Sequence, residues 1–158
     1  MKKIKEYIEE YTLLFLLYGG IYFIVECLWK HAISDWRMAV LGGVMGVLIG
    51  LLNCFFTYNT DIFLQGFVGS LMVTLAEAVG GYQWNIIEGL GIWNYSALPF
   101  SGINGQVNLF FSIAWFFLSL VCIFLDDAID YYIVRHEGQE PPYYVLFGHK
   151  LFQMKEKD

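Results

Sequence analysis

The sequence predicts an all-α membrane protein, a bundle of about four transmembrane helices with a long outer loop between the third and fourth helices. Hydrophobic residues make up 58% of the 158 residues and charged residues only 15%, whereas soluble domains carry about 25% charged residues. Four apolar runs are each long enough to cross a hydrocarbon core, which needs about 20 residues. The charged residues gather at the chain ends and in the short connections.

The four apolar runs define the expected helices in order. Each must be helical, because a lone strand in lipid would leave its backbone groups unpaired. A short charged amphipathic extension precedes them, and the transmembrane four-helix domain is expected to cover residues 1–135. The tail that follows, residues 136–158, is expected either to be cytoplasmic or to lie on the membrane surface. The runs themselves extend over residues 11–29, 38–56, 62–82 and 107–125.

Lysine and arginine residues near the runs predict the orientation in the membrane, because cytoplasmic loops carry an excess of them. With four spans, both termini and the link between the second and third spans share one side. The opposite side carries two basic residues, Lys30 and Arg37. The chain is therefore predicted to be a multi-pass protein of the cell membrane with both termini cytoplasmic. The shared side carries seven basic residues: Lys2, Lys3, Lys5, Arg135, Lys150, Lys155 and Lys157.

Small residues predict how the helices pack. Gly42, Gly46 and Gly50 stand at every fourth position of the second run and form a groove that lets another backbone approach closely. The groove is expected to accept a helix of the same chain or of a second copy, which would make a homo-oligomer. One face of the fourth run carries small and polar residues, expected to form an interhelical seam or to line a polar cavity. This face contains Asn108, Ser112, Trp115, Ser119 and Cys122.

Charge and motifs exclude several function classes. The net charge is -6 and no basic stripe is present, so nucleic-acid binding has no support. The three cysteines lack metal-ligand spacing, no phosphate-binding loop occurs, and we expect neither a metal nor a cofactor. The acidic group of Asp126, Asp127 and Asp130 is expected to be a solvated helix end.

Two acidic residues within the runs are the first functional candidates, because charges inside a span are costly and need a reason. Glu26 and Glu77 lie about six and five residues beyond the centres of their runs, which places both roughly 7–9 Å outward of the midplane. Each either has a structural role, through an ion pair with a cation such as Lys30 or Arg37 or through hydrogen bonds, or belongs to a ligand or proton site.

The connection over residues 84–106 supports the second alternative. It has no lysine or arginine and is rich in aromatic, amide and glycine residues, so we expect it to lie in the interface or to dip between helices and cover the glutamates. The sequence predicts a single outward-facing polar pocket here. Its predicted ligand-binding residues are Glu26, Glu77, Arg37, Trp93, Asn94, Tyr95, Asn104 and Gln106.

A family resemblance covers roughly residues 18–127. The segment from Trp93 to Gly105, WNYSALPFSGING, resembles the W-x-Y-S-x-x-P-F…N-G signature of the ABC-transporter permease family labelled type IV, or CmpB-like. Glu26 and Glu77 match the two glutamates of that family. Where the family often has a Gly-Pro-x-x-Pro-x-Tyr-Gly element, this chain reads MAVLGGVMGVLIG after Arg37.

The resemblance implies a permease-like protein that transports a small solute, with a separate ATPase subunit as a partner. The link over residues 57–61 is too short for a helix that docks an ATPase. Two alternatives stay open: an intramembrane enzyme that uses Glu26 or Glu77, and a non-catalytic partner or sensor subunit. The enzyme is less favoured, because no nucleophile or metal-ligand set accompanies the glutamates.

Overall fold

The computed structural model describes residues 2–134 and 140–156, and four long helices dominate these residues. Each helix is long and apolar enough to cross a membrane. The chain is therefore a multi-pass membrane protein with four candidate spans, and the fold class predicted from the sequence is confirmed. The helices are α1 (Lys2–Lys30), α2 (Trp36–Gly50), α3 (Ile62–Gly81) and α4 (Leu109–Ile129).

Capping residues define where three of the helices begin. Asp35, Asp61 and Asn108 each accept a hydrogen bond from the backbone N–H two residues on, at 2.9, 2.8 and 2.9 Å. Such caps satisfy amide groups that have no partner within the helix. Short 3-10 or π-helical segments extend the C-terminal ends of α2, α3 and α4. They are η1 (Leu51–Cys54) after α2, η2 (Tyr82–Ile87) after α3 and η4 (Asp130–Val134) after α4.

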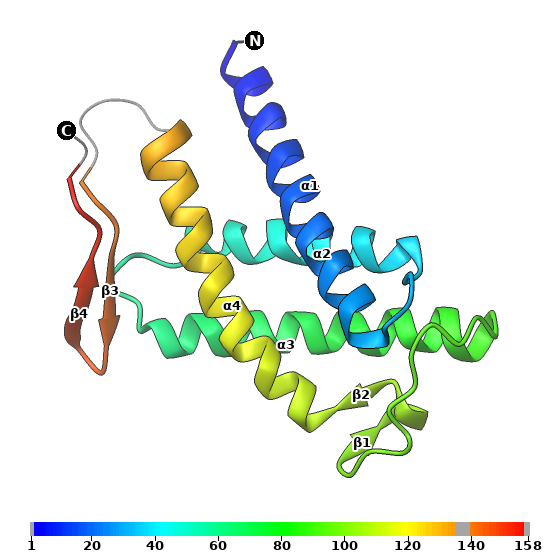
Figure 1. Cartoon of the computed structure of the whole chain (residues 1–158). Coiled ribbons are helices and arrows are strands. Elements are labelled where there is room, and N and C mark those ends of the chain that lie inside the picture. The colour runs from blue at the N-terminus through cyan, green and yellow to red at the C-terminus, as the bar shows by residue number, and fades with distance from the viewer. Residues whose placement is uncertain (1, 135–139, 157–158) are drawn as a thin grey trace.

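The helices pack mainly in two pairs, α1 on α2 and α3 on α4, with α4 also touching α2. Figure 1 shows that the start of α1, the α2–α3 link and the end of α4 lie towards one end of the bundle. The α1–α2 turn and the connection before α4 lie towards the other end. This arrangement is the alternation that four spans require. Which end faces the cytoplasm stays a prediction.

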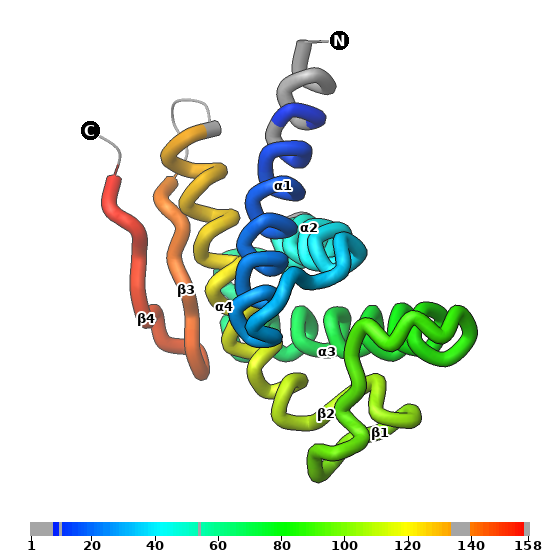
Figure 2. Tube along the Cα trace, turned by 45° about the vertical axis from the view of Figure 1, so that its right-hand side comes forward, coloured from blue at the N-terminus to red at the C-terminus, as the bar shows by residue number. Residues whose placement is uncertain are grey.

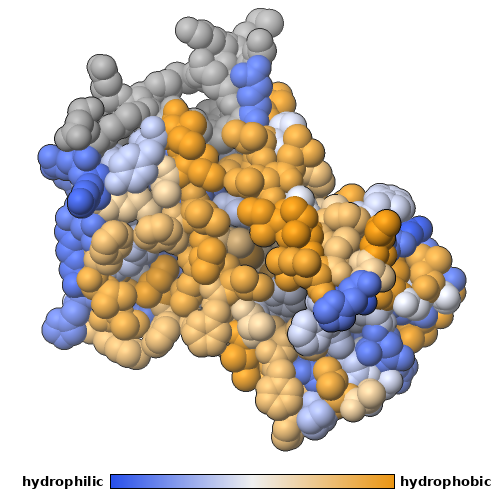
Figure 3. All heavy atoms as spheres, viewed as in Figure 1, coloured by the Kyte–Doolittle hydropathy of each residue, from blue (hydrophilic) through white to orange (hydrophobic). Residues whose placement is uncertain are grey.

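The surface supports a membrane environment. Figure 3 shows hydrophobic side chains over the visible faces of α1 and α4, with hydrophilic ones gathered towards the left and lower right of the view. Many large apolar side chains of the helices are exposed, among them Leu16, Leu28 and Phe117. Exposed apolar area of this extent would destabilise a protein in water, whereas lipid accommodates it.

The glycine face of α2 is filled within the same chain. A Cβ atom added to Gly43 would lie 2.7 Å from the carbonyl oxygen of Phe15, so the α1 backbone approaches closely here. Gly42 and Gly46 face the rings of Tyr22 and Tyr18 in the same way. The groove thus accepts α1, and a homo-oligomer through Gly42, Gly46 and Gly50 stays a prediction.

The polar face of α4 forms part of a seam with α3. Ser70 Oγ donates to the carbonyl oxygen of Ser112 at 2.6 Å, and Thr74 Oγ1 donates to Ser112 Oγ at 3.0 Å. Gly69 allows this approach, because a Cβ there would lie 2.6 Å from Ser119 Oγ. The seam expected from the sequence therefore exists along the first turns of α4.

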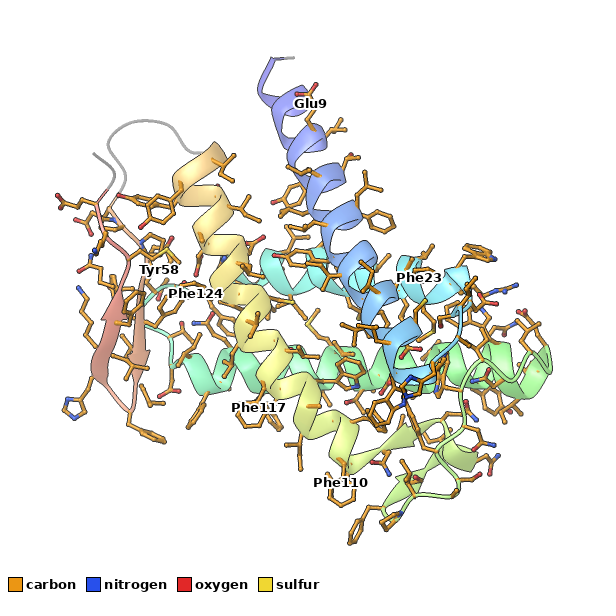
Figure 4. The ribbon with its side chains drawn as sticks, viewed as in Figure 1. Glu9, Phe23, Tyr58, Phe110, Phe117 and Phe124 are labelled. Carbon is orange, nitrogen blue, oxygen red and sulfur yellow. The ribbon has the colours of Figure 1, made fainter. Side chains whose placement is uncertain are left out.

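The C-terminal tail forms a β-hairpin, which the sequence analysis did not predict. Strands β3 (Tyr143–Leu146) and β4 (His149–Gln153) pair antiparallel beside α4, as Figures 1 and 2 show. Figure 4 shows Phe124 of α4 and Tyr58 of the α2–α3 link beside the hairpin. The ring of Phe124 is 5.9 Å from that of Tyr144, and the ring of Tyr58 is 5.6 Å from that of Tyr143.

The hairpin corrects one expectation about the acidic group at the end of α4. Asp126 and Asp127 are 9% and 3% exposed, so they do not form a solvated helix end. Asp127 Oδ2 accepts a hydrogen bond from the hydroxyl of Tyr144 at 2.8 Å. Asn53 donates to both carboxylates, at 3.2 and 3.0 Å. These aspartates therefore connect η1, α4 and the hairpin.

Candidate functional site

Glu77 is a buried carboxylate in the third span. It lies near the end of α3 and is 1% exposed. Trp115 Nε1 of α4 donates to its Oε2 at 2.8 Å, and the hydroxyl of Tyr95 donates to its Oε1 at 3.1 Å. Among the residues that the structure describes, no cation pairs with Glu77. Two hydrogen-bond donors therefore hold this group without a neutralising charge.

Glu26 differs from Glu77, because it has a cation within its own helix. Lys30 Nζ lies 2.6 Å from Glu26 Oε2, one turn later on α1. Tyr22 and Ser34 donate longer hydrogen bonds of 3.4 Å to the same carboxylate. Glu26 therefore has the contacts of a structural ion pair, whereas Glu77 has hydrogen bonds and no ion pair with a described residue.

Tyr95 brings the outer connection onto the buried glutamate. Its hydroxyl contacts Glu77, and its ring stacks on Phe111 with the ring centroids 4.4 Å apart. Burial, and then the nearby carboxylates of Glu77 and Glu26, raise the pKa of Tyr95. Both glutamates thus act on one hydroxyl, although they lie on different helices. The hydroxyl stays protonated and acts as a donor.

The rest of the connection is held by its own amides. Gln106 is 1% exposed, and its side-chain oxygen accepts a hydrogen bond from Asn85 Nδ2 at 2.7 Å. Its backbone carbonyl oxygen accepts a hydrogen bond from Trp93 Nε1 at 3.0 Å. Asn108 donates to the carbonyl oxygen of Pro99 at 2.8 Å. Trp93 and Gln106 therefore form the interior of a folded loop. Its short elements are β1 (Ser101–Gly102), η3 (Ile103–Gly105) and β2 (Val107–Asn108).

Three other predicted site residues make local contacts. Arg37 pairs with Asp35 at 3.1 Å at the start of α2. Asn94 Oδ1 accepts from the backbone of Ser96 at 2.8 Å, and the backbone carbonyl of Asn104 accepts from Gln106 at 3.1 Å. The structure thus brings Tyr95 and Glu77 into contact, with Glu26 nearby, and gives the other five residues partners of their own. Their ligand-binding role stays a prediction.

A cavity of about 130 Å³, called the central cavity below, lies between α1, α2, α3 and α4. Glu77 belongs to its wall. The other polar and aromatic wall residues lie outside the site predicted from the sequence, although the spacing of the fourth run indicates a seam or a cavity. The structure shows both, since Ser112 joins the seam and later turns of α4 face the cavity. These wall residues are Tyr18, Tyr22, Trp115, Ser119 and Cys122.

Ser119 contributes a hydroxyl that the fold leaves unsatisfied. It is 1% exposed, lies in the wall of the central cavity, and its Oγ has no hydrogen-bond partner among the described residues. Buried polar atoms are nearly always paired, so each exception needs an explanation. The wall of the central cavity thus contains a buried carboxyl group, that of Glu77, and a buried hydroxyl without a partner among the described residues.

Comparison with known proteins decides the family. The profile of the family described as "Putative ABC-transporter type IV" matches residues 13–146. The chain belongs to this family. The match spans α1 to α4 and reaches into the hairpin, so it includes Glu77, Tyr95 and every wall residue of the central cavity. The resemblance seen in the Trp93–Gly105 signature is thereby confirmed. No curated protein and no solved structure matches the chain.

Proposed function

We propose that this family member is a permease-like protein that takes a small solute into the central cavity and moves it across the membrane. One observation carries the proposal. Glu77 is buried within a span, forms no ion pair with a described residue, and borders a cavity lined by four helices. Ionisable groups inside a membrane mark substrate or ion pathways, because their burial is otherwise only a cost.

The family description supports a transport role but names no solute. An ATPase subunit belongs to the proposal as a partner. Because the α2–α3 link is too short for a docking helix, the ATPase would contact the hairpin at the same end of the bundle, which the basic residues predict to be cytoplasmic.

The alternative of an intramembrane enzyme has less support. A serine nucleophile needs a base within hydrogen-bond reach, and Ser119 Oγ has no partner among the described residues. No observation favours a sensor subunit over a permease.

Accessibility of Cys122 tests the proposal, because this residue is a natural thiol in the cavity wall. A permease must expose its cavity to each side in turn. With Cys27 and Cys54 replaced by serine, a membrane-impermeant trimethylammonium-ethyl methanethiosulfonate should modify Cys122 both in spheroplasts and in inside-out vesicles. Mass spectrometry measures the modification.

Cysteines placed at two exposed positions, Leu90 and Lys150, serve as controls for reagent access from the two sides. Modification of Cys122 from one side only, or from neither, while the controls react, would overturn the permease proposal.

A further inference from the structure

The carboxyl group in the central cavity points to a positive ligand. The two oxygens of Glu77 accept hydrogen bonds from Trp115 and Tyr95, but the burial of the group opposes its ionised form. An ionised carboxylate within a membrane is costly unless a cation neutralises it. The cations nearest in sequence to the site are engaged elsewhere, Lys30 with Glu26 and Arg37 with Asp35.

Aromatic rings in the wall suit an organic cation. Tyr22 and Trp115 both border the cavity, with their ring centroids 5.6 Å apart and their planes tilted by 58°. Tyr18, one turn before Tyr22 on α1, adds a third ring to the wall. A cation within about 6 Å of an aromatic centroid is attracted by the face of the ring, and ammonium ligands are bound in this way.

The remaining wall is apolar, which argues against a hydrated metal ion or a sugar. Metal ions such as Mg²⁺ and Ca²⁺ need several oxygen ligands, and Glu77 is the single carboxylate among the described wall residues. An apolar wall instead stabilises an apolar ligand body by removing it from water. The apolar side chains include Val25, Leu41, Met45, Ile49, Val73 and Leu118.

The position of the wall residues indicates how such a ligand enters. Val25 of α1 and Leu118 of α4 border the cavity and are 50% and 46% exposed on the outer surface of the helices. Hydrophobic side chains cover both helices on the visible face (Figure 3). The cavity therefore reaches the lipid-facing surface between α1 and α4. Its volume of about 130 Å³ is roughly ten times what one water molecule needs.

We propose that the central cavity binds an organic ammonium ion, a cationic nitrogen on an apolar body, with the nitrogen between Glu77 and the rings of Tyr22 and Trp115. The apolar body lies along the opening between α1 and α4, and Ser119, whose hydroxyl has no partner among the described residues, is part of the cavity wall. This inference rests on the proposed function, since it names the solute class of the same cavity.

A pair of probes with equal shape tests the inference. Benzyltrimethylammonium carries the cationic nitrogen, and neopentylbenzene replaces that nitrogen by carbon. Equilibrium dialysis against the full chain in lipid nanodiscs, with empty nanodiscs subtracted, should show saturable binding of radiolabelled benzyltrimethylammonium. Neopentylbenzene should compete at least tenfold more weakly than the unlabelled cation.

Two variants locate the binding. Glu77→Gln keeps the size of the side chain and removes its charge, so affinity for the cation should fall at least tenfold. Glu88→Gln removes a carboxylate in the outer connection, where Glu88 pairs with Gln83, and should leave the affinity unchanged. Size-exclusion chromatography shows whether each variant is folded, and the probe comparison on the unaltered chain does not depend on either variant.

If the cation shows no saturable binding, or if the neutral probe competes as well as the unlabelled cation, the proposed ligand class is wrong. An equal loss of affinity in both variants would overturn the placement at Glu77. Failure of the permease proposal is seen separately. Cation binding with one-sided access to Cys122 would contradict transport alone, whereas two-sided access without cation binding would contradict the ligand class alone.

Discussion

Ser119 lies in the wall of the central cavity and carries a cost in stability. Its buried Oγ has no hydrogen-bond partner among the residues that the structure covers, and such a group costs about 1–3 kcal/mol. We therefore expect Ser119→Ala to raise the free energy of unfolding of the ligand-free protein by about 1 kcal/mol. Reversible unfolding in mixed micelles measures the difference.

Ser112→Ala is the matched control on the same helix face. Ser112 Oγ donates to the carbonyl oxygen of Asn108 and accepts from Thr74 Oγ1, so its removal should lower stability by about 1 kcal/mol. Equal destabilisation by both serine variants would show that the Ser119 hydroxyl contributes a favourable hydrogen bond, against our interpretation.

Tyr95 gives a prediction with a pH dependence. Tyr95→Phe removes the hydroxyl that donates to Glu77, and a hydrogen bond to a charged group contributes about 1.5–3 kcal/mol. The pKa of Tyr95 is raised above its usual value of 10.0, so the stability from this group is complete below pH 10 and is lost as the pH rises. Thermal unfolding at pH 8 and above pH 10 should show a smaller alkaline loss in Tyr95→Phe.

Tyr82→Phe is the control for this prediction, because Tyr82 is 50% exposed at the end of α3. Its removal should change neither the stability at pH 8 nor the alkaline loss. An alkaline loss in Tyr95→Phe as large as in the unaltered chain would contradict the role assigned to the hydroxyl.

Glu26 and Glu77 show what the sequence can predict about single residues. The pair of Glu26 and Lys30 follows from a spacing of four on one helix, which places both side chains on the same face. The partners of Glu77 are 18 and 38 residues away. No local spacing encodes such contacts, because they depend on how the outer connection folds and how α3 and α4 pack.

At the scale of elements, the contact between α1 and α2 depends on glycines that leave no room for a side chain. A Cβ on Gly46 would overlap the ring of Tyr18, whereas a Cβ on Gly20 would meet nothing within 4 Å. Overpacking costs about 1–3 kcal/mol, so Gly46→Ala should lower the free energy of unfolding by that amount.

Gly20→Ala controls for the backbone effect of the same substitution. It should be neutral or stabilising by up to about 1 kcal/mol, because alanine favours a helix more than glycine does. Thermal unfolding in detergent compares the two variants. If Gly46→Ala is as stable as Gly20→Ala, α1 does not approach α2 as closely as the structure indicates.

Helices and hairpin differ in how far the sequence predicts them. The third span begins at Ile62 as expected, because hydropathy defines the run and Asp61 caps it. The hairpin turn has positive φ at Phe147 and Gly148, the geometry of a type I′ turn, in which asparagine or aspartate normally precedes the glycine. Here Phe147 stands in place of the asparagine or aspartate that would indicate the turn in the sequence. The contact of Tyr144 with Asp127 joins residues far apart in the chain, and no local pattern encodes it.

At the scale of the whole molecule, pairwise packing explains why a cavity exists. α1 packs against the glycines of α2, and α4 packs against the small residues of α3. α1 and α4 do not pack closely on each other. Side chains of α1 and α4, together with Met45 of α2 and Val73 of α3, line the space between the two pairs. The glycines of α2 therefore serve the site indirectly, because they fix the position of α1 and with it the rings of Tyr18 and Tyr22.

The whole molecule also carries the prediction of membrane orientation. The structure places the α2–α3 link and the hairpin at one end of the bundle and the outer connection at the other (Figure 1). Seven basic residues assigned to the first end, against two at the second, predict that the first end is cytoplasmic. With the native cysteines replaced by serine, an impermeant maleimide on intact cells should therefore label Leu90→Cys and not Lys150→Cys. Both positions are exposed, so permeabilised cells should show equal labelling of the two variants. Labelling of position 150 in intact cells would reverse the orientation and place the Tyr95 connection in the cytoplasm.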